Sequence, residues 1–139
     1  MMWKEKYRVG VDLIDDQHIE LFSRLSKFIQ VVQNEFNWDE KIEEVKETMV
    51  FMQEYVVIHF NDEEEYMEKI EYPKLKQHKQ IHKDFKDSIN DYVVIFQEEG
   101  YTEEKIQELC AKLMTWLIMH VGKMDQQIGE YVKLKEGQA

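Results

Sequence analysis

Four long segments of the sequence carry apolar residues three or four positions apart, the spacing that places them on one face of an α-helix. The segments are residues 18–36, 39–70, 73–98 and 102–135. With five glycines and one proline in 139 residues, the chain has few places to turn outside the breaks between these segments. Short connections make consecutive helices antiparallel neighbours. The sequence therefore predicts an all-α fold, an antiparallel up-down-up-down four-helix bundle with an irregular N-terminal arm over residues 1–17.

Side chains suited to helix ends stand at the breaks. Asp39 and Thr102 can accept hydrogen bonds from the first free backbone N–H groups of the second and fourth helices. Pro73 suits a first helical turn, and Gly100 suits the end of the third helix. Because we find no linker, no low-complexity tract and no sequence repeat, we expect residues 1–139 to form a single domain.

The charge and the cysteine content exclude several classes of partner. Eighteen Lys and Arg against 29 Asp and Glu give a formal charge of −11, whereas nucleic-acid and anionic-membrane surfaces need basic patches. The N-terminus lacks the apolar core of a signal peptide, and the longest apolar stretch, residues 113–121, is about half a membrane span. Cys110, the only cysteine, cannot form an internal disulfide or a cysteine-based metal site. We expect a cytoplasmic protein that does not insert into membranes.

All five histidines fall on the predicted apolar faces. They are His18, His59, His78, His82 and His120, and each of the four helices carries at least one. Each lies three or four positions from apolar residues of its segment, and Glu63 follows His59 by four. Residues at these spacings share a helix face, so the sequence predicts that six polar side chains point into the bundle.

This set of buried polar residues favours a metal site. One histidine on an apolar face is usually a core residue bonded to a backbone carbonyl, and the acidic run at residues 62–65 would ordinarily be a solvated face. Five imidazoles and a carboxylate buried without partners, however, would each cost about 1–3 kcal/mol or more. The pairs His59/Glu63 and His78/His82 place two donors one helical turn apart, as a shared metal ion requires.

Asp125 is ambiguous on spacing alone. It follows His120 by five positions, about 140° around an ideal helix, so it fits a solvent-facing residue as well as a site residue. A π-type bulge near Gly122 would bring His120 and Asp125 into line, and such bulges are frequent at functional sites. Gly122 is itself unusual inside a helix.

Four stretches of the sequence carry a family resemblance. They are W-K-E-K-Y-R-V-G-V-D-L-I-D-D-Q-H ending at His18, H-F-N-D-E-E from His59, Y-P-K-L-K-Q-H-K-Q-I-H from Tyr72 to His82, and W-L-I-M-H-V-G-K-M-D from Trp116 to Asp125. In these residues the chain resembles the hemerythrin family, most closely its single-domain bacterial members. The stretches cover the chain almost end to end, in the family's order and with family-like spacing.

The resemblance implies a centre of two iron ions and a set of seven ligands. The ligands carried over are His18, His59, Glu63, His78, His82, His120 and Asp125. Glu63 and Asp125 would bridge the irons together with an oxo or hydroxo group, while His78, His82 and His120 hold one iron and His18 and His59 the other. Of about twelve positions on two six-coordinate irons, one stays open beside His18 and His59. The resemblance implies reversible dioxygen binding at that position.

Neighbouring residues are predicted to surround the centre. Leu21, Phe60, Trp116 and Leu117 are expected to line a dry pocket for dioxygen. Asp15, Gln17, Glu64 and Tyr7 are candidates for hydrogen bonds that orient the imidazoles.

The leading hypothesis for function is an oxygen carrier, store or delivery protein without catalytic residues, acting as a monomer with an oxygen-consuming enzyme or a redox partner. The alternatives are a di-iron enzyme that reduces peroxide or nitric oxide, an oxygen or redox sensing module, and a structural zinc bundle. Oxygen-activating di-iron bundles use carboxylate-rich sites, which argues against the enzyme. Seven ligands exceed what one tetrahedral zinc needs.

Overall fold

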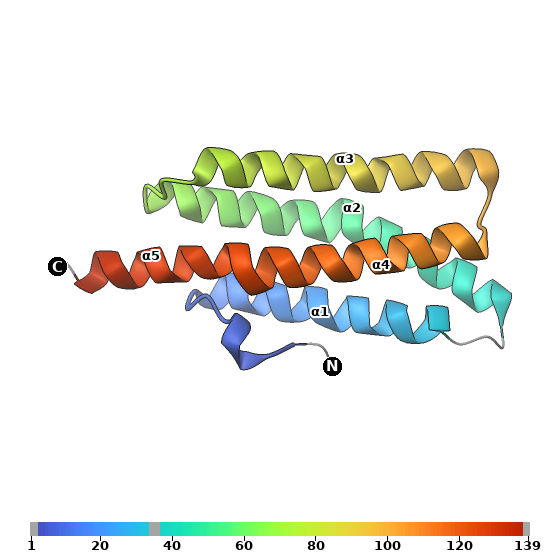
Figure 1. Cartoon of the computed structure of the whole chain (residues 1–139), viewed down its shortest axis with the longest axis horizontal. Coiled ribbons are helices and arrows are strands. Elements are labelled where there is room, and N and C mark those ends of the chain that lie inside the picture. The colour runs from blue at the N-terminus through green and yellow to red at the C-terminus, as the bar shows by residue number, and fades with distance from the viewer. Residues whose placement is uncertain (1–2, 34–36, 138–139) are drawn as a thin grey trace.

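The fold is a bundle of helices. The computed structural model of the chain describes residues 3–33 and 37–137, and no strand occurs among them. Its elements are the 3-10 turn η1 (Glu5–Tyr7), α1 (Asp12–Gln33), α2 (Trp38–Lys69), α3 (Leu75–Glu99), α4 (Glu103–Met119), the π-helical segment η2 (His120–Met124) and α5 (Asp125–Gly137). Figure 1 shows α1, α2, α3 and the continuous run from α4 to α5 lying side by side. The predicted all-α bundle is confirmed.

The first helix begins at Asp12 rather than at His18, so the irregular arm is shorter than residues 1–17. Asp15 explains the earlier start. Its carboxylate accepts hydrogen bonds from the backbone N–H groups of Val9, at 2.6 Å, and Gly10, at 3.1 Å, and so ties the arm to the first helical turn. Residues 34–36, where the first helix was predicted to end, lie outside the described residues.

The other helix ends follow the predicted chemistry with two differences. Asn37, not Asp39, caps α2, with its side-chain oxygen 3.1 Å from the Glu40 backbone nitrogen. Asp39 lies in the first turn instead, where a negative charge interacts favourably with the helix dipole. The third helix begins at Leu75, because Pro73 lies in the turn before it.

The predicted caps at Thr102 and Gly100 are confirmed. The Thr102 hydroxyl accepts a hydrogen bond from the Lys105 backbone nitrogen at 3.2 Å, at the start of α4. Gly100 ends α3 with φ = 78°, in the left-handed region that favours glycine.

Besides a smaller cluster of Val9, Ile14, Met67, Tyr72 and Ile128, the apolar stripes of the helices form one large core. Its most completely buried side chains include Phe22, Phe28, Val45, Val56, Phe60, Ile106 and Leu109. Each contributes about 1.5–3 kcal/mol by leaving water, which holds the helices together along their length. None of the described helices is both long enough and apolar enough to cross a membrane.

Candidate metal centre

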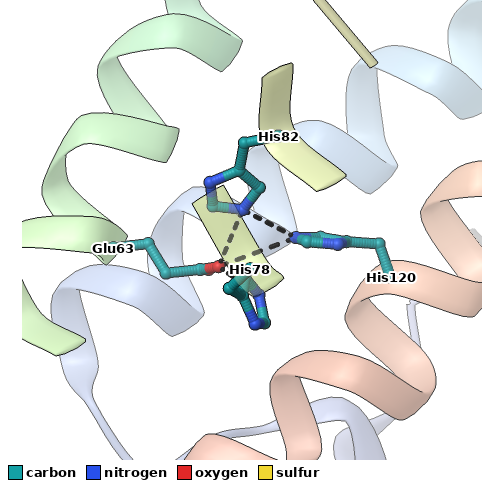
Figure 2. A group of neighbouring side chains, drawn as sticks. All are labelled: Glu63, His78, His82 and His120. Atoms are coloured by element: carbon teal, nitrogen blue, oxygen red, sulfur yellow. Dashed lines mark hydrogen bonds and ion pairs between the residues drawn. The ribbon is translucent and has the colours of Figure 1, made fainter. Parts of the chain in front are cut away.

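The polar residues that the sequence places on apolar faces are buried together inside the bundle. Seven of them, His18, His59, Glu63, His78, His82, His120 and Asp125, expose between 0% and 3% of their surface. They form two groups, and within each group one donor atom from every residue lies within 4.8 Å of the others. The groups are Glu63, His78, His82 and His120, and His18, His59, Glu63 and Asp125. Figure 2 shows the side chains of the first group converging from α2, α3 and η2.

The π-helical segment brings Asp125 into this site. Residues His120–Met124 take one extra residue per turn, so a five-residue separation returns Asp125 to the face of His120. Gln126 satisfies a carbonyl in this region, because its Nε2 donates to the Val121 oxygen at 3.2 Å and to the Tyr7 oxygen at 2.5 Å. A Cβ on Gly122 would lie 3.2 Å from the Tyr7 ring, so glycine allows the arm to pack there. The sequence left the position of Asp125 open, and the structure contains the π-type bulge near Gly122 that would bring it into line with His120.

Glu63 turns one carboxylate oxygen to each group of histidines. Its Oε1 lies 3.1 Å from His78 Nε2 and 3.2 Å from His82 Nε2. Its Oε2 lies 3.3 Å from His18 Nε2 and 3.2 Å from His59 Nε2.

Asp125 repeats this arrangement from α5. Its Oδ1 lies 2.7 Å from His78 Nε2 and 3.3 Å from His120 Nε2, whereas its Oδ2 lies 3.0 Å from His18 Nε2. Both carboxylates therefore stand between the two groups of histidines, and each histidine presents its Nε2 atom to the centre.

Several of these atoms converge without forming hydrogen bonds. His59 Nε2, Glu63 Oε1 and Asp125 Oδ2 are buried and have no hydrogen-bond partner among the described residues, although their neighbours lie about 3 Å away. A buried polar atom left in this way costs about 1–3 kcal/mol, and a cation between the lone pairs removes that cost. Imidazole and carboxylate donors suit first-row transition metals such as iron and zinc. The donor set therefore fits metal ions.

Comparison with known proteins decides the family. The sequence model of the Hemerythrin HHE cation binding domain matches residues 9–132. The chain belongs to the hemerythrin family. A bacteriohemerythrin of Clostridium acetobutylicum is 32% identical over 127 residues, which cover 91% of this chain and 96% of that protein. A bacteriohemerythrin of Stenotrophomonas maltophilia is 30% identical over 96% of this chain and 82% of its own, and one of Campylobacter jejuni is 28% identical over 97% and 98%.

Residues around the hemerythrin site orient two of its imidazoles. His59 Nδ1 donates to Gln17 Oε1 at 2.7 Å, and Gln17 Nε2 in turn donates to Asp62 Oδ2 at 2.8 Å. His82 Nδ1 donates to Glu64 Oε2 at 3.0 Å. A proton held on Nδ1 leaves the Nε2 lone pair free to face the centre.

Two of the four predicted orienting residues have other roles in this hemerythrin fold. The Asp15 carboxylate accepts a hydrogen bond from the Val9 backbone N–H in the arm, and Tyr7 packs beside Gly122. Asp62 was missed by the sequence analysis, although it follows His59 by three positions and so lies on a neighbouring part of the same helical face.

Three of the four predicted pocket residues line an internal cavity. Leu21, Trp116 and Leu117 line this cavity of about 10 Å³, with Leu25, Met52, Phe85 and Leu113. Phe60, the fourth predicted residue, packs against a ligand candidate instead, because its ring stacks on the His82 imidazole with the centroids 3.9 Å apart. The Trp116 ring stacks on the His120 imidazole at 4.7 Å.

The carboxylates of the metal-free hemerythrin site raise the pKa of two of its histidines. Burial alone lowers the pKa of His18 and of His78, but the carboxylates of Asp125 and Glu63, which lie 2.7–3.3 Å from their Nε2 atoms, outweigh it and raise each pKa to about 9. Burial raises the pKa of Glu63, yet the imidazoles of His120, His18 and His59 hold that pKa well below its usual range. Burial lowers the pKa of His59.

These pKa values predict proton release when metal binds. At pH 7, His18 and His78 carry a proton in the metal-free protein, and a ligating imidazole must be neutral, so loading should release about two protons per chain. The release should fall away as the pH rises through about 9, where the stabilisation of the metal-free fold by these two protonated histidines is also lost. Metal titration in a weakly buffered solution measures the protons, and an unchanged pH at neutrality would contradict the expectation.

Proposed function

We propose that this protein binds dioxygen reversibly at a di-iron centre inside an antiparallel up-down-up-down bundle, as a carrier, store or delivery protein. The observation that carries the proposal is the position of Glu63 and Asp125, each with one oxygen toward each group of histidines. This arrangement suits two metal ions bridged by both carboxylates. An oxo or hydroxo group would complete the bridges.

The distribution of histidines supports an open coordination position on one side. His78, His82 and His120 would hold one iron, while only His18 and His59 would hold the other. When bound, the iron pair supplies two electrons and one free coordination position beside His18 and His59. Five histidines against two carboxylates favour a binding protein over an oxygen-activating enzyme, whose di-iron bundles are rich in carboxylates.

The chain's own apolar residues would keep water away from the centre. The small cavity beside Leu21 and Leu117 is lined by apolar side chains apart from the indole of Trp116, and apolar cavities remain dry. Phe60 and Trp116 cover two of the imidazoles with their rings. A dry surrounding favours a neutral gas over water and hydrated anions. We further predict a cytoplasmic location and a monomeric state. The predicted partner is an oxygen-consuming enzyme or a redox partner.

The optical spectrum of the reduced protein before and after exposure to air tests the proposal. With iron quantified in parallel, we expect two irons per chain and a charge-transfer band that appears in air and disappears when dioxygen is removed. A colourless zinc protein contradicts the proposal. Irreversible oxidation, or turnover of added peroxide, would favour the enzyme instead.

Because the cavity is expected to be dry, admitting water to it should accelerate autoxidation. Leu21→Asn places an amide beside the cavity and should admit water, so the dioxygen-bound form should autoxidise roughly tenfold faster, equivalent to about 1.4 kcal/mol. Leu134→Asn is a suitable control because Leu134 is 67% exposed near the end of α5. The decay of the charge-transfer band gives both autoxidation rates. Equal decay in the two variants would contradict the proposal that the dry cavity slows autoxidation.

A further inference from the structure

The seam between α3 and α4 is closed by aromatic side chains rather than by close backbone approach. The backbones of α1 and α2, of α2 and α3, and of α1 and α4 come within 8 Å between Cα atoms at many positions, whereas α3 and α4 do so at isolated positions at most. Phe85 of α3 and Trp116 of α4 stack across this wider seam, with ring centroids 3.8 Å apart and planes 22° from parallel. Phe85 is buried, and the Trp116 ring continues inward to the His120 imidazole.

The stacked pair separates two spaces. Outside it lies a surface groove of about 560 Å³ between α3 and α4, whose walls include Ile81, Thr115 and Met119. Inside it lies the cavity of about 10 Å³ beside Leu21. Phe85 and Trp116 line both spaces. Leu21 and Leu117, which line the cavity, lie one helical turn from His18 and His120, so the cavity adjoins the metal centre.

We propose that the Phe85–Trp116 pair is the gate through which a small neutral ligand passes from this groove to the metal centre. The proposal rests on the function proposed above, because dioxygen is the ligand that would pass. The rings exclude water while stacked, and a rotation of either ring joins the groove to the cavity. Rotation of a side chain is a smaller motion than the displacement of a helix.

A second groove offers a less suitable route. It has about 250 Å³ between α2 and α3, and among its walls only Met52 also lines the cavity. A hydrogen bond of 3.3 Å from Gln53 Nε2 to Asn90 Oδ1 crosses this groove. An apolar gas is expected to prefer the aromatic seam, where it passes no such polar bridge.

Trp116 provides a measurement of gate opening that does not depend on iron. Its indole Nε1 is buried and has no hydrogen-bond partner among the described residues, so packing alone protects its proton from exchange with water. Phe85→Leu should therefore accelerate exchange of this proton, measured by NMR on protein loaded with zinc in place of iron.

The test combines this exchange with the dioxygen association rate of the reduced iron protein. Phe85→Leu should raise both by severalfold. Phe96→Leu is the matched control, because Phe96 lies in the same helix, is similarly buried at 5% exposure, and lies away from the cavity. It should change neither. Phe85→Met, whose unbranched side chain adapts to irregular space, serves as a second variant if the first does not fold.

Three results would overturn the gate. The indole exchange could stay unchanged in both Phe85 variants, the exchange could rise without any change in dioxygen association, or Met52→Ala could raise association while the Phe85 variants do not. If the unaltered iron protein binds no dioxygen, the proposed function fails. The gate is then decided by indole exchange alone, where a rise supports it and no change overturns it.

Discussion

Replacing Glu63 with glutamine is expected to abolish stable binding at both halves of the metal centre. Glu63 belongs to both groups of donor atoms, and its two oxygens face different histidines. An amide removes the negative charge and replaces one of the two oxygens with a nitrogen that cannot act as a comparable ligand. The loss should exceed the roughly 10–100-fold loss of affinity that follows from removing a residue outside the ligand set.

Iron per chain after desalting measures this effect, with circular dichroism as a check that the helices persist. Glu65→Gln is the matched control, because Glu65 lies two residues further along α2 and is exposed. It should keep both irons. Glu64→Gln should fall between the two, since Glu64 bonds only to the Nδ1 of His82. Two tightly bound irons in the Glu63 variant would refute its bridging position.

Gly129→Ala is expected to displace the N-terminal arm and weaken the metal centre from a distance. A Cβ at residue 129 would lie 2.5 Å from the backbone oxygen of Val9, so the arm itself must move. Overpacking of this kind costs about 1–3 kcal/mol. The arm also accepts the Gln126 hydrogen bond at Tyr7, beside the π-helical segment that positions Asp125. We therefore expect a lower unfolding temperature together with weaker iron binding.

Gly137→Ala separates this effect from a general effect of alanine in α5. Residue 137 lies in the same helix, and a Cβ there would have no neighbour within 4 Å. That variant should keep its thermal stability and its iron. If both variants behave alike in thermal unfolding and iron titration, the arm does not support the site.

The helices could be predicted because their signal is local. An apolar stripe depends only on spacing along one segment, and the caps at Thr102 and Gly100 depend on one residue each. The start of α1 could not be predicted in this way. It depends on Asp15 reaching back to Val9 and Gly10, a contact between two segments whose relative position the sequence pattern does not define.

The candidate site was likewise predictable where the signal is local and not where it depends on contacts between segments. The histidines and Glu63 are marked by their spacing from apolar residues on the helices, whereas the spacing of Asp125 from His120 was ambiguous and only the family resemblance placed Asp125 in the site. The choice among orienting residues was beyond the sequence, because Gln17 and Asp15 both lie near His18 and only side-chain geometry distinguishes them. The arm contact at Gly129 likewise depends on packing between distant segments.

Anomalous diffraction at the iron absorption edge, from crystals of the iron-loaded protein, locates the metal ions relative to the two carboxylates. We expect two iron peaks per chain, one beside His78, His82 and His120, and one beside His18 and His59. Both should lie within bonding distance of Glu63 and Asp125. A single peak, or iron bound without contact to these carboxylates, would contradict the account.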